Sequence, residues 1–179
     1  MKIILIIPAR LNSNRLKNKV TLPILSLPMI EHVRRRALIT KAFKEIYIAS
    51  QDKKIINLIN YYGGKVIKTN KRHQNGTSRA GEAVKKINCS HVVILFADEP
   101  LIEPEVLEKF VKIIRNTNVD VWNATSKIKN ISELKKKSIV KCVVDKNNKI
   151  IDLKRFINHQ IYKKKNLKIL KSVGIFCFK

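Results

Sequence analysis

The chain has 179 residues, of which 45% are hydrophobic, and this length and composition fit one soluble globular domain with a substantial core. A formal charge of +25 at pH 7 is typical of proteins that bind nucleic acids, yet only 6% of the residues are aromatic and the lysines are scattered along the chain. Composition therefore does not favour nucleic acid as the partner despite the high positive charge, and a basic nucleic-acid-binding protein stays one alternative.

Cysteine and histidine spacing excludes two further classes. Cys89, Cys142 and Cys177 lie far apart, and the four histidines include no H-x-x-x-H pattern, so neither a disulfide framework nor a structural zinc site is indicated. The first apolar run is too short for a signal peptide, and no later run approaches the length of a membrane span. We expect a cytoplasmic protein with reduced thiols and no membrane partner.

Short apolar runs alternate with segments of helical spacing along the first two thirds of the chain. This alternation predicts a mostly parallel sheet with helices on both faces. The predicted strands cover residues 2–7, 45–49, 65–68, 91–96 and 120–125.

Helix starts are indicated by residues that cap or open helices. The first helix is predicted to begin near Pro28, with residues 34–36, three arginines, facing solvent. Asp52 is suited to cap the second helix, and this helix is predicted to end at Gly63 and Gly64. A third helix is predicted from Thr77 or Ser78, and a fourth from Pro104.

The pattern changes after residue 125. Residues 139–145 and 149–155 predict a β-hairpin that turns at Asn147 and Asn148. Residues 172–178 predict one more strand, which we expect to leave an exposed sheet edge.

A basic loop follows the first predicted strand. Four cations, Arg10, Arg15, Lys17 and Lys19, occur within ten residues and no acid accompanies them. Open α/β sheets bind their ligands at the carboxyl ends of strands, and several cations there are suited to hold phosphates. The alternative is a basic surface loop.

Two more blocks bear on the site. Asp98 comes shortly after the predicted strand 91–96, where a carboxylate facing the basic loop is suited to hold Mg²⁺ against a triphosphate; the alternative is a turn with a helix cap. Residues 72–79 contain His73, Gln74 and Arg79, and their alternative is a loop capped by Thr77.

These blocks resemble a known family. The pattern I-P-A-R-x-x-S-x-R-L-x-x-K occurs at residues 7–19, H-x-x-G-T-x-R at residues 73–79 and D-E-P-L-I at residues 98–102. Together they resemble the cytidylyltransferases that activate acidic sugars, most closely the 3-deoxy-manno-octulosonate (Kdo) cytidylyltransferases, or CMP-Kdo synthetases. The resemblance extends over the whole chain in order.

The resemblance implies a three-layer α/β/α sandwich with a mostly parallel central sheet, of the nucleotide-diphospho-sugar transferase type. It further implies that residues 1–179 form a single cytidylyltransferase domain that makes CMP-Kdo and pyrophosphate from CTP and Kdo for lipopolysaccharide biosynthesis, as a homodimer. Family members continue past the last predicted strand and carry a second metal-binding aspartate there. We therefore expect a C-terminally incomplete domain of impaired activity, and Asp145 and Asp152 are the first replacements to consider.

Site roles are carried over from the matched positions. Lys19 and Asp98 are expected to be catalytic, and Asp98 is expected to bind Mg²⁺, the one cofactor that the resemblance implies. His73 and Arg155 are expected to contact the sugar. The nucleotide is expected to be bound by Pro8, Ala9, Arg10, Ser13, Arg15, Lys19, Gln74 and Arg79.

Departures from the family leave the substrate open. Phe96 and Ala97 stand where the family usually has Q-G, and residues 49–52, A-S-Q-D, stand where it commonly has A-T-D-H. One alternative is a cytidylyltransferase for another acidic sugar, an amino-Kdo or a nonulosonate. Another is a non-catalytic nucleotide-binding remnant.

Overall fold

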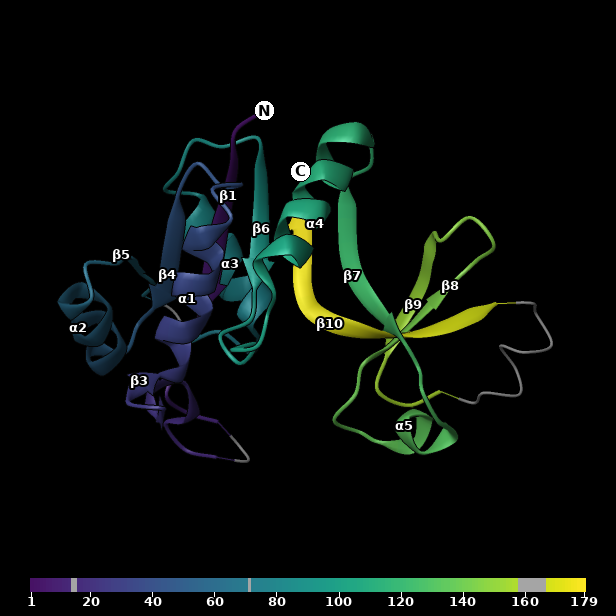
Figure 1. Cartoon of the computed structure of the whole chain (residues 1–179), viewed down its shortest axis with the longest axis horizontal. Helices are drawn as coiled ribbons and strands as arrows, with labels where there is room; N and C mark the ends of the chain where they lie inside the picture. Colours follow the sequence, from purple (N-terminus) through teal and green to yellow (C-terminus); the bar gives the residue numbers. More distant parts are fainter. Residues whose placement is uncertain (14–15, 71, 158–166) are drawn as a thin grey trace. The chain divides into compact units, whose positions relative to one another are not determined.

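The computed structural model describes residues 1–13, 16–70, 72–157 and 167–179 (Figure 1). Its backbone contacts divide the chain into two compact units, a first unit of Met1–Trp122 with Phe176–Lys179 and a second unit of Asn123–Ile175. Strands β7 (Val121–Lys127) and β10 (Lys168–Phe178) run through both units. A single domain over residues 1–179 therefore stays a prediction.

The first unit is built on a parallel sheet. Its strands lie in the order β5 (Lys65–Lys68), β4 (Ile46–Ser50), β1 (Ile3–Pro8) and β6 (His91–Leu95), and β10 follows β6. All residues of β1 are buried, as expected for a central strand that is covered on both faces. The predicted strands are confirmed to within about two residues at each end.

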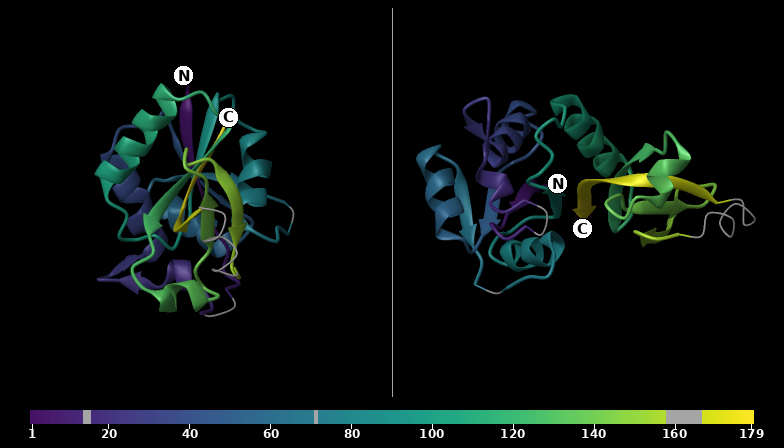
Figure 2. Two further views of the ribbon diagram at one scale, coloured as in Figure 1. Left: turned by 90° about the vertical axis from the view of Figure 1, so that its right-hand side faces the viewer. Right: turned by 90° about the horizontal axis from the view of Figure 1, so that it is seen from below.

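Helices cover both faces of this sheet. They are α1 (Met29–Ile39), α2 (Lys53–Tyr61), α3 (Gly76–Val84) and α4 (Pro104–Asn116). Figure 2 shows α1 and α4 on one face and α3 on the other. Ile4 and Ile6 of β1 pack with Ala80 and Ala83 of α3, and the alternation of a strand directs the residues between them to the opposite face. The predicted three-layer α/β/α architecture is confirmed.

The predicted start of α3 is wrong, and the predicted cap of α2 is confirmed in position but not in its side-chain hydrogen bond. The cap of α3 is Asn75, whose Oδ1 accepts a hydrogen bond from the Ser78 amide at 2.8 Å, so the helix begins before Thr77 and Ser78. Asp52 does precede α2, but its side chain makes no hydrogen bond to that helix. Its carboxylate is occupied by another partner, the backbone amide of Leu11.

Arg34 does not face solvent as predicted. It is buried because Glu31, which has no exposed surface, lies one helical turn earlier on α1 and needs a countercharge. Arg34 donates to both oxygens of Glu31 at 2.7 Å and to the carbonyl of Tyr62 at 2.9 Å. Arg35 adds a second cation to Glu31 at 2.8 Å. The cluster fixes α1 to the residue that ends α2.

A small hairpin between the basic loop and α1 escaped the sequence analysis. A short 3₁₀ helix, η1 (Lys19–Thr21), is followed by β2 (Pro23–Ile24) and β3 (Leu27–Pro28). Leu25 and Ser26 form its turn with φ values of 46° and 65°. Such turns favour glycine and asparagine, so these two residues give no turn signal.

The second unit contains the predicted hairpin, β8 (Lys141–Val144) and β9 (Ile150–Lys154), which pair antiparallel. Asp145 holds the turn because its Oδ1 accepts from the amides of Asn147 and Lys149 at 2.9 and 2.8 Å. A short helix, α5 (Ile131–Lys135), completes the unit.

The expected exposed edge at the last strand is wrong. β10 lies between β6 and β8 in the sheet order and also pairs with β7, so its backbone hydrogen bonds are taken up along its length. Ile175 and Cys177 of this strand are buried. Burial raises the pKa of the Cys177 thiol to about 12, and no disulfide is formed by the three cysteines.

Gly76 and Gly81 provide a matched test of packing on α3. A Cβ at Gly76 would lie 3.0 Å from Pro8 Cγ and 3.2 Å from Phe96 Cε1, whereas a Cβ at Gly81 meets nothing within 4 Å. We expect Gly76→Ala to lower the free energy of unfolding by about 1 to 3 kcal/mol through overpacking. Gly81→Ala should raise it by up to about 1 kcal/mol, the helix-propensity gain. Urea unfolding of both variants checks this, and equal effects would contradict the close contact.

Candidate functional site

The sequence-predicted residues of the first unit gather at one edge of its sheet. Strands β5, β4, β1 and β6 are parallel, so their carboxyl ends lie along the same edge. Backbone hydrogen bonds join the segments that leave them: the Ala9 amide donates to Ala49 at 2.9 Å, and the Thr69 amide donates to Ser50 at 3.0 Å. The loops after these strands form the candidate site.

The basic loop is held at Leu11. Its amide donates to Asp52 Oδ2 at 2.8 Å, and its carbonyl accepts from the Asn18 amide at 3.0 Å. Asn18 has a left-handed backbone, φ 57°, and leads directly into η1 with Lys19. Pro8 and Ala9 are buried beneath the loop, while Arg10 is exposed and Ser13 half-buried. Arg15 lies outside the described residues.

Lys19 and Asp98 meet across this edge. The Nζ of Lys19 lies 2.6 Å from Asp98 Oδ2, and the two side chains are 23% and 40% exposed. The predicted approach of the β6 carboxylate to the basic loop is therefore confirmed. The expectation that no acid neutralises the loop is wrong, because Asp98 does so through the fold rather than through the local sequence.

Arg10 and Arg79 differ in exposure. Arg10 donates to the carbonyl of Gln74 at 3.4 Å and remains exposed. Arg79 is only 3% exposed and donates to the Thr69 hydroxyl at 2.5 Å. Burial lowers the pKa of Arg79, and the charge of Asp52 acts in the opposite direction. Arg79 therefore lies within the framework of the site, whereas the Arg10 guanidinium is open to a ligand.

His73 is paired with a residue that the sequence did not single out. Its Nε2 lies 2.6 Å from Glu82 Oε2 on α3, and the other oxygen of Glu82 accepts from the Asn70 amide at 2.9 Å. Glu82 thus holds two points of the segment before α3. The sequence does not predict the contact between His73 and Glu82, because it depends on how the segment before α3 folds onto that helix.

Phe96 forms an apolar contact beside the loop. Its ring lies where a Cβ on Gly76 would touch it, and it packs at 6.0 Å between ring centroids against Phe176. Phe96 is half-buried, and its ring presents an apolar surface to the start of α3.

Arg155 belongs to the second unit. Its guanidinium donates to the carbonyls of Lys137 and Ser138 at 3.0 and 3.2 Å. The expected substitutes for a second metal carboxylate are engaged locally, Asp145 in its turn and Asp152 with Lys154 at 2.7 Å. Within the described parts of the chain, no three His, Cys, Asp or Glu side chains form a metal-ligand cluster.

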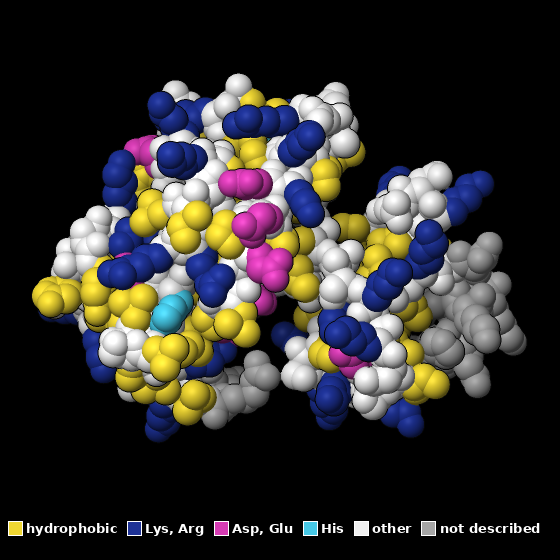
Figure 3. All heavy atoms as spheres, viewed as in Figure 1, with side chains coloured by type: hydrophobic (Ala, Val, Ile, Leu, Met, Phe, Trp, Pro, Cys, Tyr) yellow, Lys and Arg dark blue, Asp and Glu magenta, His cyan; other side chains and the backbone are white. Residues whose placement is uncertain are grey.

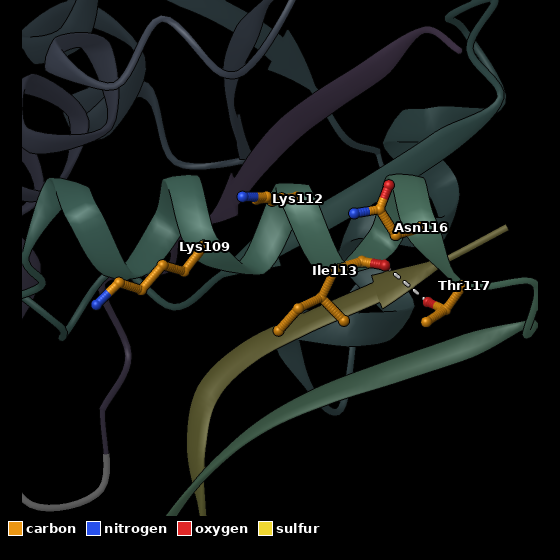
Figure 4. A pocket seen from close by; sticks show the side chains of 5 residues that line it. All are labelled: Lys109, Lys112, Ile113, Asn116 and Thr117. Carbon is orange, nitrogen blue, oxygen red and sulfur yellow. Dashed lines mark hydrogen bonds between the residues drawn. The ribbon is translucent and has the colours of Figure 1, made fainter.

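A second concave surface lies on α4. Figure 4 shows a pocket lined by this helix and the residue after it, in which the Thr117 hydroxyl donates to the Ile113 carbonyl at 2.7 Å. None of the sequence-predicted site residues lines it. Its lining residues are Lys109, Lys112, Ile113, Asn116 and Thr117.

Basic side chains are dispersed over the visible surface. On the face in Figure 3, lysines and arginines alternate with apolar groups and with a row of acidic side chains, and they form no continuous basic stripe. Among the described helices, none is long and apolar enough to cross a membrane.

Comparison with known proteins identifies the family. The family model described as Cytidylyltransferase matches residues 4–179. The 3-deoxy-manno-octulosonate cytidylyltransferase of Fusobacterium nucleatum is 36% identical over 182 residues, which covers 100% of this chain and 74% of the relative. That of Thermodesulfovibrio yellowstonii is 34% identical over 155 residues, covering 82% of this chain and 61% of the relative.

A relative with a different substrate is equally similar. The 8-amino-3,8-dideoxy-manno-octulosonate cytidylyltransferase of Shewanella pealeana is 34% identical over 160 residues, covering 87% of this chain and 65% of the relative. The chain thus spans between 61% and 74% of the length of these three relatives.

Solved structures agree in fold. A CMP-2-keto-3-deoxy-manno-octonic acid synthetase in complex with CTP superposes with a TM-score of 0.88 at 31% identity, covering 100% of this chain and 74% of the other. The 4-diphosphocytidyl-2C-methyl-D-erythritol synthase of Anaerococcus prevotii, at 15% identity and a TM-score of 0.61, shares the fold alone. From the family model and these relatives, the chain belongs to the cytidylyltransferase family.

Proposed function

We propose that this chain carries the nucleotide site of an enzyme that transfers CMP from CTP to the anomeric hydroxyl of Kdo. The observation that carries the proposal is the Lys19 and Asp98 pair at the carboxyl edge of the sheet, in a fold that superposes on a CTP-bound synthetase. In the reaction the sugar oxygen bonds to the α-phosphorus, the bond from that phosphorus to the bridging oxygen breaks, pyrophosphate leaves and the hydroxyl gives up its proton.

Positioning and charge neutralisation carry most of such a transfer. Lys19 and Arg10 are proposed to hold the phosphates, and Arg15, which lies outside the described residues, stays a predicted phosphate contact. Ser13 and the backbone around Pro8 and Ala9 supply short donors and a rigid base. Gln74 presents its carbonyl to Arg10 at 3.4 Å and so orients that guanidinium.

Asp98 fits a role in holding Mg²⁺. Mg²⁺ is bound in nucleotide sites by one or two carboxylates together with substrate phosphates and water, so one exposed carboxylate at the edge suffices for the protein's share. When bound, the ion would neutralise phosphate charge and polarise the reacting centre. Asp98 and the basic loop are the chain's contribution to that arrangement.

The Lys19 and Asp98 ion pair has to open for this function. Each side chain is the other's partner at 2.6 Å, so Lys19 would have to release Asp98 to hold a phosphate, and Asp98 would then be available to hold Mg²⁺. Both are partly exposed, and an exposed pair contributes little stability, so the exchange costs little. Lys19 then lies where it stabilises the negative charge that develops on the leaving pyrophosphate.

Sugar identity rests on fewer contacts. His73 of the first unit is proposed to contact the acidic sugar, although Glu82 holds it. Arg155 bonds two carbonyls within the second unit and stays a predicted sugar contact. Relatives of both the Kdo and the 8-amino-Kdo type match at similar identity, which keeps 8-amino-Kdo as the second candidate substrate. Assembly as a homodimer and a place in lipopolysaccharide biosynthesis are proposed with the activity.

Pyrophosphate release tests the function. With Mg²⁺ present, we expect release from CTP but not from ATP, GTP or UTP, and only after Kdo or 8-amino-Kdo is added. The ratio of kcat/KM for the two sugars assigns the substrate. Release that needs no sugar, or CTP binding that calorimetry fails to detect, would contradict the proposal.

Single substitutions test the two central residues. Lys19→Ala should weaken CTP binding by about 1.5 to 3 kcal/mol, the scale of a charged hydrogen bond, whereas Lys109→Ala, at an exposed lysine of α4 outside the basic loop, serves as the control that leaves it unchanged. Asp98→Asn should abolish the Mg²⁺ dependence of CTP binding and leave the free energy of unfolding within about 1 kcal/mol of the parent. A Lys19 effect confined to sugar affinity would reverse the assignment.

A further inference from the structure

Asp52 makes an unusual contact for its position in the chain. It occupies the residue before α2 with extended backbone, φ −82° and ψ 115°, where an aspartate normally bonds the first turn of its own helix. Its Oδ2 instead accepts from the amide of Leu11, 41 residues earlier, at 2.8 Å. The carboxylate therefore stabilises the basic loop in place of its own helix.

The contact leads to Lys19 in three steps. Asp52 fixes the Leu11 amide, the Leu11 carbonyl accepts from the Asn18 amide at 3.0 Å, and Asn18 directly precedes Lys19. The Thr21 amide donates to the Asn18 carbonyl at 2.8 Å, which closes the short helix that carries Lys19. A displacement of Leu11 would thus move the backbone from which Lys19 reaches Asp98.

Asp52 is itself held in place. Its amide donates to the buried Ser50 hydroxyl at 3.1 Å, and the Ser50 carbonyl accepts from Thr69, whose hydroxyl binds Arg79. The buried positive charge of Arg79 is favoured by the negative charge of Asp52. The aspartate is thereby fixed by β4 and balanced by α3, a rigid support for a loop.

We propose that Asp52 is a positioning residue, which sets the basic loop in the geometry that receives the phosphates of the nucleotide. The proposal rests on the proposed function for the identity of the ligand, and on the hydrogen bonds above for the position of the loop.

Two substitutions at Asp52 separate its hydrogen bond from its charge. Asp52→Ala removes both, whereas Asp52→Asn retains an oxygen that accepts from Leu11. Glu45→Gln is the matched control, because Glu45 precedes β4 at the opposite end and its carboxylate pairs with Lys65 at 2.8 Å. Amide hydrogen exchange by NMR follows Leu11 and Asn18, and calorimetry follows Mg²⁺ with CTP.

In Asp52→Ala we expect amide exchange at Leu11 and Asn18 to accelerate about tenfold or more. The Kd for CTP should also rise about tenfold or more, because one charged hydrogen bond is lost. Asp52→Asn should restore most of the Leu11 protection and part of the affinity, and Glu45→Gln should change neither. If Asp52→Ala fails to fold, Asp52→Asn is the test. The proposal then requires the Kd for CTP of this variant to exceed that of the parent protein, because the variant lacks the negative charge.

Three results would overturn the proposal: unchanged Leu11 exchange in Asp52→Ala, accelerated exchange with unchanged CTP affinity, or an equal effect of Glu45→Gln. Failure of the proposed function looks different. In that case the parent protein binds no CTP, but the amides of Leu11 and Asn18 still exchange faster in Asp52→Ala. Asp52 would then hold the loop for a ligand other than CTP, and the assignment to nucleotide phosphates would be wrong.

Discussion

The burial of β1 on both faces is the constraint on which the first unit depends. Its residues are apolar and buried without exception, so it has to lie inside the sheet with helices on either side. Parallel neighbours, β4 and β6, then pair with it and end at the same edge. The chemistry-bearing loops follow from this placement, since each begins where one of these strands ends.

Three carboxylates organise this edge in a chain that is otherwise strongly basic. Asp52 holds the loop after β1, Asp98 pairs with Lys19, and Glu82 holds the segment that contains His73. Asp52 and Asp98 each join segments that are distant in sequence, whereas Glu82 holds the segment just before its own helix. Of these three carboxylates, Asp98 belongs to the exposed ion pair that can exchange partners with a ligand. Asp52 and Glu82 support the loops around it.

Sequence alone predicted the features that local pattern determines. The strand positions in the alternating region, the β8 and β9 hairpin and the approach of Asp98 to the basic loop follow from periodicity and from the parallel sheet, whereas the strand order became visible only in the structure. It failed where a side chain chooses a distant partner over a local one: Arg34 turns inward to the buried Glu31, and Asp52 bonds Leu11 rather than α2. The burial of Arg79 likewise has no local signature in the sequence.

The central claim is that Mg²⁺ and CTP bind at the shared carboxyl edge of β1 and β6. Backbone amide spectra recorded during a titration with Mg²⁺ and CTP test it directly. The account predicts that the signals of Leu11, Lys19, Gly76 and Asp98 shift together and saturate at one concentration. Shifts that instead centre on the α4 pocket around Lys112, or that leave Lys19 and Asp98 unchanged, would contradict it.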